Sequence, residues 1–309
     1  MRIFYHLEKF LPPAQPLVLT IGNFDGVHRG HAFVLQQVFT QAQAVEGSSC
    51  VLTFSNHPSE ILKPDHPTSL LCTSQHKLEL LKEIGVDSLV FMPFTAHLAQ
   101  ETAKAFIQKL CNHIPFSHLI LGYDATLGKD RQGDRSVMQQ LAKELNFQIQ
   151  YLEEYKDQGD PISSSRIRQR LQQGDLQAVE SLLGRPYSIY SKVLSGSGQG
   201  KLLGFPTANL STQGLCLPPY GVYAVQIKKK GLLFSGIANL GIAPTLKNNS
   251  YPILEVHLLC HIQDMYDEEI EVIFLQFIRP EKKFVSVDDL KTQIQLDVDY
   301  VKRLVFYED

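Results

Sequence analysis

The sequence contains no apolar run of the roughly 18 residues or more that a membrane-spanning helix needs. Its first residues, Met1 to Glu8, lack the apolar core of a signal peptide. The five cysteines are odd in number and scattered, and they form no Cys-x-x-Cys pair, which favours reduced thiols over a disulfide framework. These absences predict a cytoplasmic protein with no membrane partner.

The chain also lacks long basic runs, and its formal net charge is −3. Both features argue against nucleic acid as the main partner. The densest basic cluster, Lys228-Lys229-Lys230, is better explained as a solvated hairpin tip than as a binding patch. No internal repeat or low-complexity segment is present, and 309 residues are ample for two domains with sizeable cores.

Strand-like apolar runs alternate with helix-like segments in the first half of the chain. We expect strands over Leu17–Ile21, Cys50–Phe54, Ser88–Phe91, Leu119–Leu121 and Phe147–Leu152. We expect helices from about His31, Thr73, Glu101 and Asp134. Such alternation predicts a doubly wound parallel sheet that binds its ligands at the carboxyl ends of its strands.

The first of these strands is followed by a glycine-rich turn, Gly-Asn-Phe-Asp-Gly-Val-His-Arg-Gly-His, over Gly22 to His31. A strand, a glycine turn and a helix start together favour anion binding, because free N–H groups and the helix dipole point at the ligand. His28 and His31 are placed on one side of the turn. A glycine turn or a histidine pair alone indicates packing more often than chemistry. The full order, however, resembles the signature of FAD synthetases in the nucleotidyltransferase superfamily, which transfer AMP from ATP.

Two further stretches resemble that family and follow later strands. In Asn56-His57-Pro58, the resemblance implies that His57 holds a phosphate of FMN or ATP, although a helix-capping role fits the sequence equally well. The segment from Leu121 to Asp134 resembles the family's Gly-x-Asp-Phe-x-Phe-Gly stretch and implies that Asp124 contacts a ribose or a metal. Ala125 and Leu127 replace both aromatics, which alters the adenine or flavin pocket.

A third stretch, Ile162 to Arg168, opens a helix with hydroxyl side chains that can act as N-caps. It also resembles the Ser-Ser-Thr-x-Ile-Arg segment of FAD synthetases, which grips the β- and γ-phosphates of ATP. The resemblance implies catalytic roles for His28, His31 and Arg168 with magnesium. It implies nucleotide binding by Gly22, Phe24, Asp25, Gly30, Asp124, Ser164 and Ser165.

The second half of the chain has short β-type runs with turns and no helices between them. These runs are Tyr187–Leu194, Gly221–Ile227, Leu232–Ile237, Leu254–Leu259 and Ile270–Phe277. They predict a small closed barrel. From Val287 to Phe306, apolar residues recur at helical spacing, so we expect a terminal helix packed on that barrel.

A glycine-rich stretch, Ser195 to Leu210, offers backbone N–H groups to phosphates. Thr207 and Asn209 follow with two hard oxygens, which suit a magnesium-nucleotide. The hexapeptide Gly-Phe-Pro-Thr-Ala-Asn resembles the signature of riboflavin kinases. That resemblance implies nucleotide binding by Gly196, Gly198, Gly200 and Lys201, the last in place of the usual arginine.

The resemblance to riboflavin kinases extends to three later segments. It implies that Asn239 and Arg279 bind the flavin and that Glu255 is the general base. Burial of a carboxylate in an apolar strand costs free energy, so such a residue is usually either paired or functional. Pairing with Arg279 is the structural alternative for Glu255.

The motifs occur in the order found in prokaryotic bifunctional riboflavin kinase/FAD synthetases, and the resemblance covers essentially the whole chain. It implies an FMN adenylyltransferase domain over 1–184 and a riboflavin kinase domain over 185–309. It further implies riboflavin, FMN and ATP as substrates and Mg²⁺ as the required metal. Two alternatives stay open: a riboflavin kinase with weak or absent FAD synthesis, and a non-catalytic flavin-binding or sensing protein.

Overall fold

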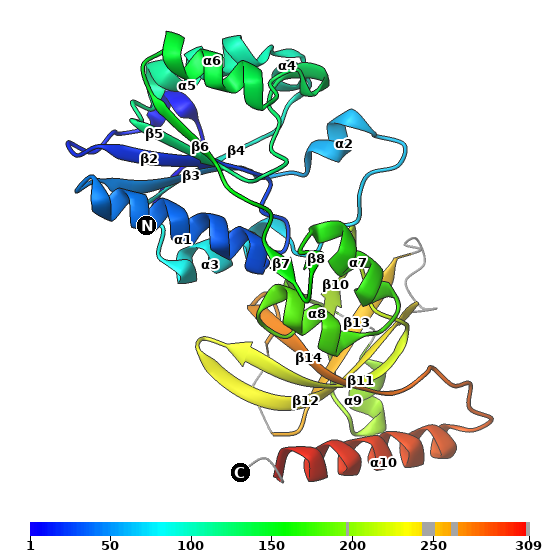
Figure 1. Ribbon diagram of the computed structural model, residues 1–309. Helices are drawn as coiled ribbons and strands as arrows, with labels where there is room; N and C mark the ends of the chain where they lie inside the picture. The colour runs from blue at the N-terminus through cyan, green and yellow to red at the C-terminus, as the bar shows by residue number, and fades with distance from the viewer. Residues whose placement is uncertain (196–197, 243–250, 261–264, 307–309) are drawn as a thin grey trace. The chain divides into compact units, whose positions relative to one another are not determined.

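The computed structural model describes residues 1–195, 198–242, 251–260 and 265–306 (Figure 1). The chain divides into two compact units. The first, the sheet unit, contains Met1–Leu70 and Lys77–Ser164. The second, the barrel unit, contains Leu71–His76 and Ser165–Asp309. None of the helices in the described ranges has the length and apolar composition of a membrane span.

The sheet unit is built on six parallel strands in the order β1-β4-β3-β2-β5-β6. They are β1 (Arg2–Phe4), β2 (Leu17–Ile21), β3 (Ser48–Phe54), β4 (Ser88–Met92), β5 (His118–Leu121) and β6 (Gln148–Tyr151). Strand order reverses between β2 and β5, so the switch point, where such sheets bind ligands, lies at the carboxyl end of β2. The expected parallel sheet is confirmed.

Helices cover both faces of this sheet, as a doubly wound fold requires (Figure 1). On one face lie α1 (Arg29–Ala44) and α3 (Ser74–Ile84), where Leu35 and Leu81 pack with Val51 of β3. On the other face lie α5 (Ala103–His113) and α6 (Arg135–Glu144), with Ile107 and Met138 in the core.

Several short elements of the sheet unit were not expected from the sequence. They are α2 (Pro58–Leu62), α4 (Ala96–Gln100), the 3-10 turns η1 (Leu7–Lys9) and η2 (Lys129–Arg131), and the strands β7 (Lys156–Asp157) and β8 (Asp160–Pro161). Elements of two to five residues are too short to show a hydrophobic period. The edge strand β1 was missed for the same reason.

The barrel unit is a closed barrel of six antiparallel strands in the order β10-β13-β12-β11-β14-β9. They are β9 (Ser188–Leu194), β10 (Ala208–Ser211), β11 (Gly221–Lys229), β12 (Leu232–Ile242), β13 (Pro252–Leu258) and β14 (Glu269–Arg279). The expected barrel is confirmed. Lys230 and Gly231 both have positive φ, which is the geometry of a tight two-residue hairpin between β11 and β12.

The remaining helices are α7 (Ser164–Gln172), α8 (Leu176–Leu183), α9 (Gln199–Leu203) and α10 (Val287–Phe306). The expected terminal helix is α10, and its Ile294 and Val298 pack with Val222 and Ile237 of the barrel. Helix α9 and the first three residues of β10 lie within the glycine-rich stretch Ser195 to Leu210, where neither a helix nor a strand was expected.

Candidate functional sites

The loop between β2 and α1 lies at the switch point of the parallel sheet. Its start is fixed by two hydrogen bonds to β3: Gly22 N donates to Leu52 O (3.1 Å), and Thr53 Oγ1 donates to Asn23 O (3.1 Å). Phe24 and Val27 have φ of 50° and 40°, a left-handed conformation that costs about 1–3 kcal/mol at a non-glycine residue. Such strain persists only where the surroundings hold it, and it is typical of ligand sites.

His28 and His31 lie together at the start of α1. His28 is the N-cap, and its Nδ1 accepts a hydrogen bond from His31 N (3.3 Å). The two rings stack with centroids 3.6 Å apart. A Cβ at Gly30 would lie 3.1 Å from the His28 ring, so the small residue makes room for it. Because Nδ1 is an acceptor, a neutral His28 carries its proton on Nε2 and can donate it to an anion.

The surroundings of His31 do not favour the positive charge that it would need to neutralise a phosphate. Its Nδ1 is buried and has no hydrogen-bond partner among the described residues. Burial holds the pKa of His31 well below its usual range, and the nearby His28 and Lys77 lower it further. At neutral pH, His31 is therefore a neutral hydrogen-bonding group rather than a cation.

A cavity of about 570 Å³ opens beside this loop. It is lined by Gly22, Phe24 and His31, together with Asp124 from the segment after β5. Ala125 and Leu127 also line it, and they pack against the apolar core on the α5 side of the sheet. Aromatic side chains come from other elements instead: Phe54, Phe94 and Phe106. The cavity is thus present despite the two missing aromatics.

The other residues predicted for this site lie in several different surroundings. Asp25 is buried, and its carbonyl accepts a hydrogen bond from Ser164 Oγ (3.1 Å). Ser165 and Arg168 belong to the barrel unit, at the start of α7. His57 caps α2, where its Nδ1 accepts from Ser59 N and its own N–H donates to Glu60. This is the capping role left open above, and flavin binding by His57 stays a prediction.

In the barrel unit, residues from five strands form one row across the sheet. Asn209 of β10 lies opposite Glu255 of β13, and Glu255 lies opposite Asn239 of β12. The row continues through Val222 of β11 to Arg279 of β14. Directly opposed residues of antiparallel strands point to the same face. Register therefore brings together four of the predicted residues, which are up to 70 positions apart in the sequence (209 to 279).

This row lines a cavity of about 420 Å³. Thr207, Gly198 and Gly200 line the same cavity. A Cβ at Gly200 would lie 2.5 Å from Phe205 O and 3.0 Å from Thr207 Oγ1, so a larger residue would displace the threonine hydroxyl. Gly196 lies outside the described residues, as does the side chain of Lys201.

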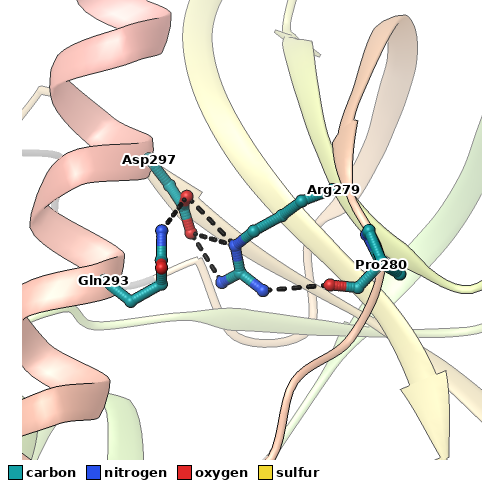
Figure 2. A network of polar contacts seen from close by, with 4 residues as sticks. All are labelled: Arg279, Pro280, Gln293 and Asp297. Carbon is teal, nitrogen blue, oxygen red and sulfur yellow. Dashed lines mark hydrogen bonds and ion pairs between the residues drawn. The ribbon is translucent and has the colours of Figure 1, made fainter.

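The Glu255 carboxylate has no cationic partner among the described residues. Within the described ranges its carboxylate makes no hydrogen bond, and it is half-buried. Burial raises the pKa of the Glu255 carboxyl, and the Glu281 carboxylate raises it further. Arg279 does not serve as its partner, because the guanidinium holds Asp297 of α10 instead (Figure 2).

Comparisons with known proteins agree with these two sites. The FAD synthetase family model matches residues 12–166, and the riboflavin kinase family model matches residues 183–305. The bifunctional riboflavin kinase/FMN adenylyltransferase of Haemophilus influenzae is 38% identical over 93% of this chain and 94% of its own length. Its counterpart in Pseudomonas fluorescens is 34% identical over 98% of both chains. The chain belongs to this family.

A solved structure shows the same fold over nearly the whole length. It is the crystal structure of a macrolide-efflux protein from Streptococcus pneumoniae, with a TM-score of 0.82 and 26% sequence identity. The match covers 97% of this chain and 98% of that one. The family assignment itself rests on the sequence relatives and the two family models.

Two residues at these sites were missed by the sequence analysis: Lys77 and Asp297. Lys77 is buried and donates to the carbonyls of Asn23 and Phe54. Asp297 is buried against Arg279 and also accepts from Gln293 (Figure 2). The sequence could have revealed both, because each is a charged residue on the apolar face of an amphipathic helix.

Proposed function

We propose that each unit carries one of the two activities of its family. The barrel unit phosphorylates riboflavin with ATP to give FMN and ADP. The sheet unit then transfers AMP from a second ATP to FMN, giving FAD and pyrophosphate. The separate family matches to the two halves of the chain support this division of labour. A domain boundary between residues 184 and 185 stays a prediction.

In the barrel unit, Glu255 is the proposed general base. The terminal ribityl hydroxyl of riboflavin attacks the γ-phosphorus of ATP, and the bond to the bridging oxygen of ADP breaks. The hydroxyl must lose its proton as it attacks, and the Glu255 carboxylate accepts that proton. The raised pKa and the absence of a neutralising partner in the described structure support this role.

Thr207 and Asn209 are the proposed magnesium ligands. Both line the cavity, and they offer a hydroxyl and an amide oxygen, the donor type that Mg²⁺ prefers. A magnesium ion bound there would neutralise charge on the ATP phosphates. Gly198, Gly200 and the Lys201 side chain are proposed to hold those phosphates. Asn239 and Arg279 are proposed to contact the flavin.

In the sheet unit, an FMN phosphate oxygen is the proposed nucleophile at the α-phosphorus of ATP. It is already anionic, so positioning and hydrogen bonding suffice without a strong base. His28, through its Nε2 proton, and the start of α1 are proposed to stabilise the transferring phosphate. Asp124 is proposed to accept from a ribose, and Ser164, Ser165 and Arg168 to bind the leaving pyrophosphate.

A second candidate is a riboflavin kinase with weak FAD synthesis. Ala125 and Leu127 favour it, because they take the place of two aromatics in the adenylyl-transfer pocket. The cavity of about 570 Å³ and its other aromatic residues, Phe54, Phe94 and Phe106, argue for a working pocket.

The observation that carries the proposal is the row from Asn209 to Arg279, in which register places four of the residues proposed for the kinase site side by side. Chromatographic analysis of products from riboflavin, ATP and magnesium, repeated from FMN, tests it. FMN followed by FAD is expected. FMN alone would support the second candidate, and no phosphorylated flavin at all would leave only a flavin-binding protein.

A further inference from the structure

Lys77 of α3 is a buried cation that the mechanism above does not use. Its side chain is almost completely covered, although lysine is rarely buried unless it is paired. Its Nζ donates to Asn23 O and to Phe54 O, each at 2.9 Å. Asn23 follows β2 and Phe54 ends β3, so the ammonium joins the carboxyl ends of two neighbouring strands. In a doubly wound sheet this edge is the ligand-binding edge.

The group that Lys77 holds is the strained loop of the adenylyl-transfer site. Asn23 directly precedes Phe24, whose φ is 50°. The Phe24 ring packs with its centroid 5.0 Å from that of His31, and both residues line the cavity. Asn23 O also accepts from Thr53 Oγ1, so two donors fix one carbonyl next to the left-handed residue. Movement of Asn23 would shift Phe24, and with it the stacked histidines.

We propose that Lys77 is a positioning residue for FMN adenylylation: it locks the β2–α1 loop in the conformation that presents His28 and His31 to the transferring phosphate. This proposal rests on the function proposed for the sheet unit. The nearby cation also acts on His31 directly, because His28 and Lys77 are the charged or titratable groups that lower the pKa of His31.

The test replaces Lys77 with methionine, which fills a similar volume without the charge or the donors. We expect Lys77→Met to lower kcat/KM for FMN adenylylation by about 100-fold, mainly through kcat, since a misplacement of about 1 Å has that effect. Riboflavin kinase activity of the same preparation should be unchanged. The matched control is Lys82→Met on the same helix, because the Lys82 side chain is 62% exposed; it should leave both activities unchanged.

A second variant and a second measurement separate positioning from mere folding. Thr53→Val removes the other donor to Asn23 O and should lower adenylylation in the same direction by about tenfold. Lys77→Arg keeps the charge and two or more donors, so it should recover part of the loss. In Lys77→Met, loss of the cation should raise the pKa of His31. If the adenylylation rate falls at low pH, that fall should then begin at a higher pH than in the wild type.

The outcomes are distinguishable. A wild-type chain that makes no FAD contradicts the function proposed for the sheet unit. A Lys77→Met chain that adenylylates FMN within about twofold of wild type overturns the role of Lys77 alone. Equal loss of both activities in Lys77→Met, with Thr53→Val at the wild-type rate, overturns it as well, because the lysine would then only maintain the fold.

Discussion

The two units arrange their functional residues in different ways, and the difference follows from the nucleophile that each is proposed to use. The sheet unit relies on one continuous segment: a strained loop, a helix N-terminus and two stacked histidines contributed by ten consecutive residues, 22–31. The barrel unit relies on side chains from five strands, placed side by side by register. A phosphate nucleophile needs orientation and hydrogen bonds, whereas an alcohol needs a base.

The ionisable groups reflect the same contrast. In the barrel unit, burial raises the pKa of Glu255, which increases its basicity. In the sheet unit, burial lowers the pKa of His31, which keeps the imidazole neutral and able to donate or accept a hydrogen bond. Since the two reactions can be assayed separately, each unit is an internal control for variants of the other.

Glu255→Gln should have the largest effect. The amide keeps the size of the side chain but cannot accept the ribityl proton, so riboflavin kinase kcat should fall by about 10³-fold, within the range of general-base contributions. FMN adenylylation should be unchanged. Steady-state assays of both reactions test this. Normal kinase turnover by the variant would show that Glu255 is not the general base. The proposed contrast between the two units would then have no support in the barrel unit.

His28→Asn should have the next largest effect. Asparagine is also a good N-cap, so the start of α1 should keep its cap while the imidazole is lost. Loss of one donor to the transferring phosphate should lower adenylylation by about 10²–10³-fold and leave kinase activity unchanged.

His57→Asn is the matched control, because His57 is also an N-cap whose Nδ1 accepts from the helix. A rise in KM for FMN in this variant would support flavin binding by His57, and unchanged kinetics would leave it as a cap. If the two variants had equal effects, the special role of His28 would be wrong.

The local structure from β2 to α1 was predictable from the sequence, and the alignment of residues across the barrel was not. Gly22 to His31 is continuous, so strand, turn and helix follow one another in the order of the chain. The row from Asn209 to Arg279 depends on the register of five strands, which no single segment encodes. Motif resemblance named four of its five residues, all except Val222, but their alignment needed the structure.

The two missed charges have a common cause. Charged residues on helices are ordinarily solvent-exposed, so Lys77 and Asp297 did not stand out. Yet Lys77 shares a helix face with Leu81 and Ile84, and Asp297 shares one with Ile294 and Val301. A charge within an apolar stripe indicates a buried partner. The identity of that partner, a carbonyl pair for Lys77 and Arg279 for Asp297, comes from tertiary contacts.

Asp297→Asn should affect the stability of the barrel unit rather than either reaction directly. The side chains of Arg279 and Asp297 are 13% and 4% exposed, and removal of one charge leaves the other without its partner. Breaking a buried pair costs about 3–5 kcal/mol, and the slight exposure of Arg279 favours the lower end. Urea denaturation followed by circular dichroism measures this. Asp299→Asn, on the exposed face of α10, is the control and should be neutral.

The smallest expected effect is a difference in pH dependence between the two reactions. A general base at Glu255 would work only as a carboxylate, and the pKa of Glu255 is raised, so kinase kcat/KM should begin to fall at a higher pH than an ordinary glutamate would give. The sign is fixed: protonation of the base removes activity as pH falls. Between pH 7 and 6 the loss should stay below about tenfold, since one pH unit changes the ionised fraction by at most tenfold. Protonation of ATP affects both reactions. The fall of kinase activity at low pH can therefore be assigned to Glu255 only if the residual kinase activity of Glu255→Gln does not show it. A fall that persists in that variant would assign the pH dependence to the substrates.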